Sequence, residues 1–319
     1  MEEKLVKIIN EMADYLNIAQ MKKLQEVLIK NLSDARPEKE QISNQEYLKM
    51  FIEAKQIEGC SARTLQYYQV TIEHLLKNID TVIRKITTDE IRTYLAEYQQ
   101  RNNCSKVTVD NVRRNISSFF SWLEEEDYIL KSPMRRIHKI KTKQPVKEII
   151  SDEMIERLRD NCRCSRDLAM IDLLYSTGIR VGELVGLNIS DIDFEERECV
   201  VYGKGDKERR VYFDAKAKLH LQNYINSRTD TNPALFVTLD SPYERLKISG
   251  VEIRVRELGR KLNIEKIHPH KFRRTMATRA IDKGMPIEQV QKILGHSQIG
   301  TTMQYAIVNQ NNVKTSHRR

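Results

Sequence analysis

Six residues in the second half of this 319-residue chain have side chains that together could cut a phosphodiester. Guanidinium groups form paired hydrogen bonds with phosphate oxygens and stay protonated at ordinary pH. A tyrosine hydroxyl can attack phosphorus, although a phenol with a pKa of about 10 needs nearby cations or a base to help it. The residue types therefore predict phosphodiester cleavage without a metal. The six candidate catalytic residues are Arg180, Lys204, His270, Arg273, His296 and Tyr305.

His270 and Arg273 are three residues apart and follow Pro269. Proline is favoured at the first position of a helix, and residues three apart lie on one face of a helix. We therefore expect a helix that begins at Pro269 and points both side chains at the same phosphate. The N-terminus of that helix would favour an anion. Of the two histidines, His270 is our candidate for the base that helps the tyrosine.

Two further spacings suggest support for the site. Glu183 follows Arg180 by three residues and could orient its guanidinium. Gly295 precedes His296, and its missing side chain would let the backbone approach closely while the imidazole donates to a phosphate oxygen.

In order and local spacing, these residues resemble the active site of the tyrosine site-specific recombinases of the phage integrase family, and the Xer-like members most of all. The resemblance covers about residues 42–307. It implies that Tyr305 forms a 3′-phosphotyrosine, that Lys204 protonates the departing 5′ oxygen, and that strands exchange through a Holliday junction without cofactor or metal. Two residues depart from the family pattern: Arg274 stands where a histidine is frequent, and Phe272 where a leucine is common.

Two other functions use related features. A DNA-binding protein of the same fold that no longer cuts would not need every one of these side chains. A type IB topoisomerase shares the chemistry but acts alone on non-specific sites, and the length and Xer-like layout disfavour it. Within the recombinases, integration, excision, inversion and dimer resolution all stay open, as does the target sequence.

Composition points to a polyanionic partner. The chain has 54 Lys and Arg against 45 Asp and Glu, a net charge of +9, which favours a polyanionic partner such as nucleic acid or an anionic membrane surface. The resemblance implies that this partner is double-stranded DNA with specific recombination sites and that there is no small-molecule substrate. No apolar stretch of about 18 residues could span a bilayer, and the charged N-terminus is unlike a signal peptide, so we expect a cytoplasmic protein at the bacterial nucleoid and no membrane partner. The five scattered cysteines, Cys162 and Cys164 among them, suit neither a disulfide framework nor a zinc site.

Hydrophobic periodicity predicts a mainly α fold, in which a helical segment is followed by a segment of helices with a small β-sheet. The resemblance implies that the first is a core-binding domain and the second an α+β catalytic domain. Residues 1–32 could form one long helix or two short ones. The predicted divisions are an N-terminal helical extension and linker at 1–41, the core-binding domain at 42–130, a basic linker at 131–150, the catalytic domain at 151–307 and a tail at 308–319.

Within these divisions, Ser61, Thr87 and Ser105 are plausible helix starts. Helices are predicted at 44–56, 62–78, 88–101 and 108–125, then at 152–159, 166–177, 183–187, 215–227, 249–262, 269–283, 287–294 and 301–305. Strands at 198–202 and 209–213 are predicted to form a hairpin with Lys204 at its tip.

Basic residues outside the six are expected to contact DNA phosphates. They are Lys139, Lys141 and Lys143 in the linker, Arg113 and Arg114 on a helix, and Lys207 and Arg209 in the hairpin.

The resemblance also implies assembly into a tetramer on two synapsed sites. In the family, a C-terminal segment often passes cyclically between subunits, a heterologous contact that closes into a ring. We expect the tail after Tyr305 to dock on a neighbouring protomer in this way, through Ile307, Val308 and Val313.

Overall fold

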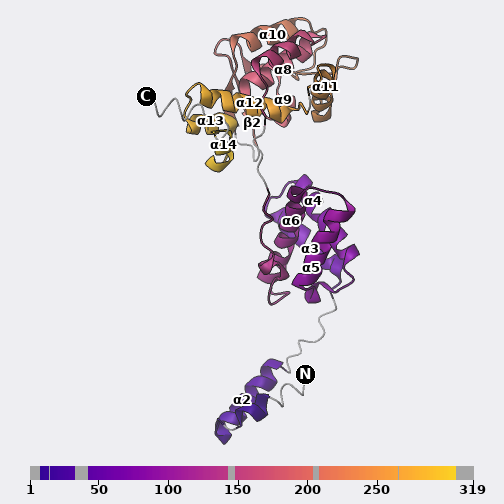
Figure 1. Cartoon of the computed structure of the whole chain (residues 1–319), viewed down its shortest axis with the longest axis vertical. Helices are drawn as coiled ribbons and strands as arrows, with labels where there is room; N and C mark the ends of the chain where they lie inside the picture. Colours follow the sequence, from indigo (N-terminus) through magenta and orange to yellow (C-terminus); the bar gives the residue numbers. More distant parts are fainter. Residues whose placement is uncertain are drawn as a thin grey trace. The chain divides into compact units, whose positions relative to one another are not determined.

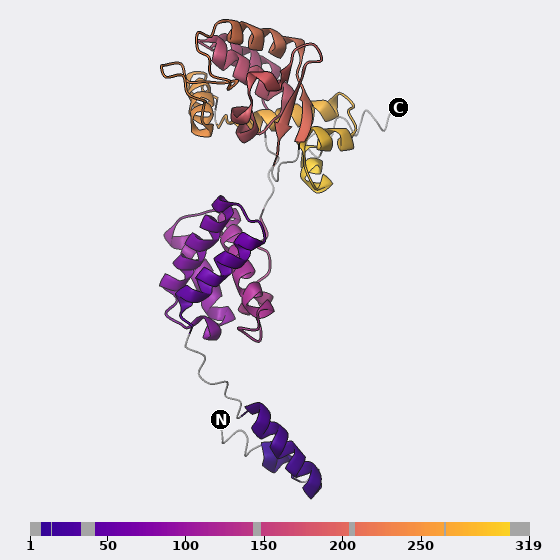
Figure 2. The same cartoon turned by 180° about the vertical axis from the view of Figure 1, so that it is seen from behind.

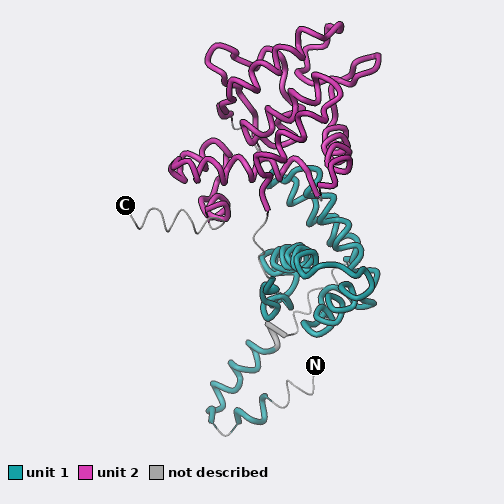
Figure 3. The backbone as a smooth tube through the Cα atoms, turned by 45° about the horizontal axis from the view of Figure 1, so that its top comes forward, with its two compact units in different colours: residues 1–144 teal, residues 145–319 magenta. Residues whose placement is uncertain are grey.

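The computed structural model describes residues 8–13, 15–32, 42–142, 148–203, 208–264 and 266–306 (Figure 1). The chain divides into two compact units, residues 1–144 and 145–319 (Figure 3). The first unit is helical, and the second adds a small antiparallel sheet to its helices (Figure 2). The fold class predicted from the sequence is confirmed.

The N-terminal residues form two helical segments, at residues 8–12 and at α2 (Ile18–Leu32). The start of α2 is closed reciprocally: the Asn17 backbone N–H donates to Gln20 Oε1 at 3.1 Å, and the Gln20 N–H donates to Asn17 Oδ1 at 2.9 Å. Such a cap satisfies N–H groups that have no partner inside the helix. Of the two possibilities that the sequence left open, the chain adopts two short helices.

Four helices make the main body of the first unit, and each begins after a serine or threonine whose side chain accepts from a first-turn N–H. The predicted starts at Ser61, Thr87 and Ser105 are confirmed. Phe51 and Phe119 meet edge to face in the core, with ring centroids 5.2 Å apart. The helices are α3 (Asn44–Ile57), α4 (Ala62–Asn78), α5 (Thr88–Arg101) and α6 (Lys106–Glu125).

Residues 131–142 pack on this helical body, although the sequence analysis placed them in a linker. The short helix η2 (Pro133–Arg136) buries Met134, and Ile137 and Ile140 pack against the same core. Asp110 Oδ1 also accepts from the Ile140 backbone N–H at 3.0 Å. Three apolar residues at a spacing of three anchor the segment, and the basic residues between and around them masked that pattern.

The second unit contains a three-stranded antiparallel sheet in the order β1-β2-β3. Cys199 pairs with Ile192 on one side and with Val211 on the other. The predicted hairpin strands are confirmed, whereas β1 is too short for a periodicity argument to find. The elements are α7 (Asp152–Asp160), α8 (Ser165–Thr177), α9 (Val181–Gly186), β1 (Ile192–Asp193), β2 (Glu198–Tyr202), β3 (Glu208–Tyr212), α10 (Ala215–Asn226), α11 (Ile248–Lys261), α12 (Pro269–Asp282), α13 (Ile287–Leu294) and α14 (Ile299–Ala306).

Helix α8 runs through the core of this unit, with α10 and α12 packed against it. It buries two carboxylates, and both are paired: Asp167 with Arg166 at 2.8 Å and with Arg254, and Asp172 with Arg159 at 2.6 Å. Pairing of this kind is what makes a buried charge tolerable. Helix α8 is therefore held firmly in the core, and its C-terminal end gives a defined position to the residues that follow it.

Candidate active site

Arg273 lies deepest of the predicted site residues, with 3% of its surface exposed. Its Nη1 donates to the Gly178 carbonyl oxygen at 2.7 Å, and its Nη2 donates to the Leu294 carbonyl oxygen at 2.5 Å. Burial and the nearby Arg180 lower the pKa of Arg273 to about 10, so it remains a cation at neutral pH. These carbonyls place its guanidinium between the end of α8 and the end of α13.

Arg180 enters the site from the chain between α8 and α9. Helix α8 is capped by Gly178, whose φ of +64° is a left-handed conformation that glycine adopts without strain. Glu183 in the first turn of α9 accepts from the Arg180 backbone N–H and from its Nη1, both at 2.8 Å. The Arg180 side chain keeps 37% of its surface exposed, and its Nη2 donates to the Gly295 carbonyl oxygen at 3.3 Å. It can therefore meet a ligand from solvent.

His296 sits in the turn after α13. Its Nε2 lies 3.1 Å from Arg273 Nη2, and its Nδ1 lies 2.9 Å from the hydroxyl of the buried Thr302. Because the guanidinium can only donate, Nε2 accepts and Nδ1 carries the proton toward Thr302. Burial, followed by Arg273 and Arg180, lowers the pKa of His296 to about 4. The imidazole is therefore neutral at pH 7 in the free protein.

Tyr305 lies on α14 with its ring stacked beside His296, the two centroids being 6.1 Å apart. It is half-buried against an apolar cluster formed by α12 and α13, which includes Val290 and Leu294. Helix α14 packs on both of those helices. The ring is held by packing, and its neighbour is the imidazole that contacts Arg273.

His270 is exposed at the start of α12, in the first turn after Pro269 as predicted. Burial of part of the ring and the positive charges of Arg273 and Arg180 lower its pKa. A neutral imidazole with a lone pair can accept a proton, so this environment suits a base. Its ring centroid lies 6.3 Å from that of His268.

The geometry thus joins four of the six predicted residues through a series of contacts, from Arg180 through the turn at Gly295 to His296, Arg273 and Tyr305. His270 lies within the electrostatic reach of both arginines. Lys204 falls outside the described residues.

Comparison with known proteins matches this arrangement to one family. The sequence profile of the phage integrase family matches residues 147–312, and that of the phage integrase N-terminal SAM-like domain matches residues 47–130. The chain belongs to the phage integrase family. It is a Xer-like tyrosine recombinase, an enzyme class that breaks and rejoins DNA strands.

The similarity to known recombinases extends over most of this chain. Tyrosine recombinase XerC from Leptospira interrogans is 31% identical over 296 residues, which is 89% of this chain and 95% of that protein. The crystal structure of XerA recombinase is 29% identical with a TM-score of 0.50, covering 87% of this chain and 99% of that one. XerH site-specific recombinase bound to a palindromic difH substrate shares the fold at 19% identity, with a TM-score of 0.68 and coverage of 86% and 84%.

Arg209 was expected to contact DNA, and the structure of the recombinase places it inside the protein instead. Its side chain is 11% exposed, and its guanidinium donates to both carboxylate oxygens of Glu183 and to the Ile293 carbonyl oxygen. Because two of these hydrogen bonds pair its charge with the Glu183 carboxylate, Arg209 is less available to a phosphate than the exposed Arg180. The sequence showed a cation in a basic hairpin, but not which carboxylate it would pair with.

Of the residues in the first unit that were expected to contact DNA, one is paired inside the protein and three are exposed. Arg113 has a 12% exposed side chain and donates to Asp110 at 2.8 Å, so it anchors the helix rather than presenting a charge. Arg114 has a 63% exposed side chain, and Lys139 and Lys141 are exposed. These three can meet a phosphate. Lys143 and Lys207 fall outside the described residues.

Thr302 is the site residue that the sequence analysis missed. It is fully buried and fixes the imidazole orientation of His296, yet a threonine on an amphipathic helix has no spacing that distinguishes it. Within the described ranges, no cluster of three or more metal-ligating side chains is present. No described helix is long and apolar enough to cross a membrane.

Proposed function

We propose that the recombinase cleaves DNA at specific sites by attack of Tyr305 on a phosphodiester held by Arg180 and Arg273. The observation that supports this most is the contact series that links the two guanidinium groups, His296 and the Tyr305 ring. Cations placed where charge develops stabilise the transition state, because no reorganisation is needed at the moment of reaction. The covalent product is a 3′-phosphotyrosine with a free 5′ hydroxyl.

Each nearby side chain then has a separate role. Arg180 and Arg273 bind non-bridging oxygens of the scissile phosphate. His296 donates to one of those oxygens after taking up a proton at Nε2. His270 accepts the phenolic proton, and Lys204 gives a proton to the leaving 5′ oxygen. Reversal of these steps on an exchanged strand rejoins the DNA, and two such exchanges pass through a Holliday junction.

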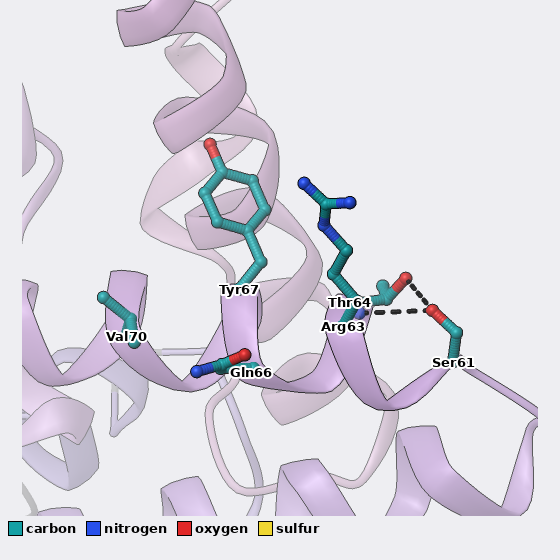
Figure 4. Close-up of a pocket in the computed structure, with 6 residues that line it drawn as sticks. All are labelled: Ser61, Arg63, Thr64, Gln66, Tyr67 and Val70. Carbon is teal, nitrogen blue, oxygen red and sulfur yellow. Dashed lines mark hydrogen bonds between the residues drawn. The ribbon is translucent and has the colours of Figure 1, made fainter. Parts of the chain in front are cut away.

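Helix α4 offers a surface for reading the site. Arg63 and Tyr67 project from the same side of this helix, with Gln66 and Val70 beside them (Figure 4). All four are exposed, and the Ser61 cap fixes the helix start from which they project. An α-helix fits the major groove, where glutamine and arginine side chains can pair with base edges. We infer that this face contacts bases, while Arg114, Lys139 and Lys141 contact phosphates.

Assembly completes the active form. We infer two protomers on each site and a tetramer on two synapsed sites at the bacterial nucleoid, where a chain with a net charge of +9 is attracted to DNA. The tail that would link protomers, together with Ile307 before it, lies outside the described residues. A cavity of about 630 Å³ beside α12 and α13 is our candidate acceptor for it. Its lining combines apolar residues such as Met276 and Met285 with charged ones such as Arg279 and Lys283.

Trapping the covalent intermediate tests the function. In a DNA duplex nicked a few nucleotides to the 3′ side of the scissile phosphate, cleavage releases the short fragment that carries the free 5′ hydroxyl. That fragment diffuses away and cannot attack the phosphotyrosine, so the protein stays attached to the rest of the strand. We expect the wild-type protein to form this adduct on a denaturing gel and Tyr305→Phe to form none, with half-site affinity unchanged since only the attacking oxygen is removed.

Supercoiled plasmid carrying two sites separates the alternatives. Recombinant products identify a recombinase, relaxation without crossover products would indicate a topoisomerase, and binding without any adduct would indicate a protein that does not cut. An adduct formed by Tyr305→Phe would reject Tyr305 as the nucleophile.

A further inference from the structure

Arg209 joins three separate parts of the catalytic unit. Its Nη1 and Nη2 donate to the two carboxylate oxygens of Glu183 at 2.8 and 2.7 Å, and its Nε donates to the Ile293 carbonyl oxygen at 2.8 Å. Arg209 lies on β3, Glu183 on α9 and Ile293 on α13. A single planar guanidinium thus fixes three elements that approach the site from different directions.

Through Glu183, Arg209 influences the position of Arg180. The same carboxylate accepts from Arg209 and from the Arg180 side chain and backbone N–H. Burial would raise the pKa of Glu183, and the hydrogen bonds from Arg209 do most to lower it below its ordinary value. Without Arg209, Glu183 would be a buried carboxylate with one remaining arginine, and that arginine would be drawn toward it and away from a phosphate.

Through the Ile293 carbonyl and the neighbouring Gly295, Arg209 also supports the turn that carries His296. Gly295 has a φ of +62°, and a Cβ at this position would lie 3.0 to 3.2 Å from the Arg209 side chain. The turn that presents His296 therefore runs directly over the guanidinium. The charge of Arg209 also contributes to the lowered pKa of His296.

We infer that Arg209 is a positioning residue that sets Arg180 and His296 against the scissile phosphate and ties both to the β2–β3 hairpin. The inference rests on the proposed function, because it assigns Arg209 a part in that phosphate site. It touches no substrate. A lysine could replace its charge but not its planar set of three donors, which is needed to reach a carboxylate and a carbonyl together.

The test compares Arg209→Lys and Arg209→Met with Arg228→Met. Arg228 is a matched control because it too is buried, pairs with a carboxylate, Asp230, and donates to backbone carbonyls, yet it does so in a loop unconnected to the site. Loss of either arginine should lower the midpoint of thermal unfolding. Only loss of Arg209 should alter the site.

Three measurements follow at a temperature where all variants are folded: half-site affinity, covalent-adduct rate on the nicked duplex, and the pKa of His296 by NMR. For both Arg209 variants we expect retained affinity and an adduct rate reduced on the order of a hundredfold, comparable to loss of one oxyanion donor. On a substrate with a neutral methylphosphonate at the scissile position, the difference in adduct rate between the wild type and the Arg209 variants should be smaller. The arginines then have less negative charge to stabilise. We expect the His296 pKa to differ from the wild-type value in Arg209→Lys. Because this variant keeps the charge, such a change reports a displaced turn. The His296 pKa should be unchanged in Arg228→Met.

The inference is overturned if Arg209→Lys matches the wild type in adduct rate and His296 pKa, or if Arg228→Met shows the same losses as Arg209→Met. Failure of the proposed function would look different, because the wild-type protein would then form no adduct. The His296 titration would still report whether Arg209 sets the turn.

Discussion

At the scale of single residues, the two phosphate-binding arginines are held in different ways. Arg273 is anchored by carbonyl oxygens on opposite sides, so its position does not depend on the ligand. Arg180 is exposed at its tip and oriented by Glu183. One guanidinium is therefore fixed in advance, and the other can close on the phosphate as it arrives.

His296 leads to a prediction about pH. In the free site its pKa of about 4 leaves Nε2 unprotonated, and that nitrogen accepts from Arg273. A phosphodiester oxygen would take over the Arg273 N–H and favour the protonated imidazole, so the pKa of His296 should rise on binding. The complex then holds more protons than the free components. By linkage, affinity should increase as the pH falls from 7 toward the free pKa.

Calorimetry of Tyr305→Phe binding to its site, in buffers of different ionisation enthalpy, measures this proton uptake. The second substitution His296→Gln should reduce the uptake. A parallel His270→Gln variant gives the share that belongs to the other histidine, whose pKa is also lowered in the free site. Equal uptake with and without His296 would contradict the predicted change of protonation.

Residue types and their order pointed to Arg180 with its partner Glu183, but not to Thr302 or to the pairing of Arg209. A buried partner such as Thr302 depends on where α14 packs, and the pairing of Arg209 with Glu183 depends on the approach of β3 to α9. Both are long-range relations that local spacing does not contain. The roles of Arg180, His270, Arg273, His296 and Tyr305 remain predictions until the variants are measured.

At the scale of elements, the helices were predictable because their starts are marked by side-chain caps and their cores by regular apolar spacing. Residues 131–142 were not, because Met134, Ile137 and Ile140 are spread among basic residues and have a helical body to pack on only once the fold has formed. Packing of this segment places Lys139 and Lys141 on the first unit.

Helix α4 allows base reading to be separated from phosphate contact. If Gln66 pairs with a base edge, Gln66→Ala should relax the preference at one position of the site by about 1–3 kcal/mol. Arg114→Ala should instead weaken binding to all sequences alike and reduce the salt dependence by about one counterion. Sequencing of bound random duplexes, together with salt titrations, distinguishes the two. An unchanged base preference in Gln66→Ala would exclude this residue from base reading.

At the scale of the whole molecule, Tyr305 stands at the end of the last described helix, and the sequence continues directly into the tail. Docking of that tail on a neighbour would also fix α14, which within the described chain packs mainly on α12 and α13. Assembly on DNA and placement of the nucleophile would then be one event. This coupling would keep a lone protomer from cutting.

Deletion of residues 309–319 tests the coupling. We expect the truncated protein to bind a single half-site with unchanged affinity, because the proposed DNA-contacting residues all lie upstream, but to lose most synapsis and recombination between two sites. Native mass measurements with DNA count the protomers in each complex, and Met276→Glu in the full chain, which places a charge in the proposed acceptor cavity, should reproduce the defect. Normal tetramers and normal recombination by the truncated protein would show that the tail has no part in assembly.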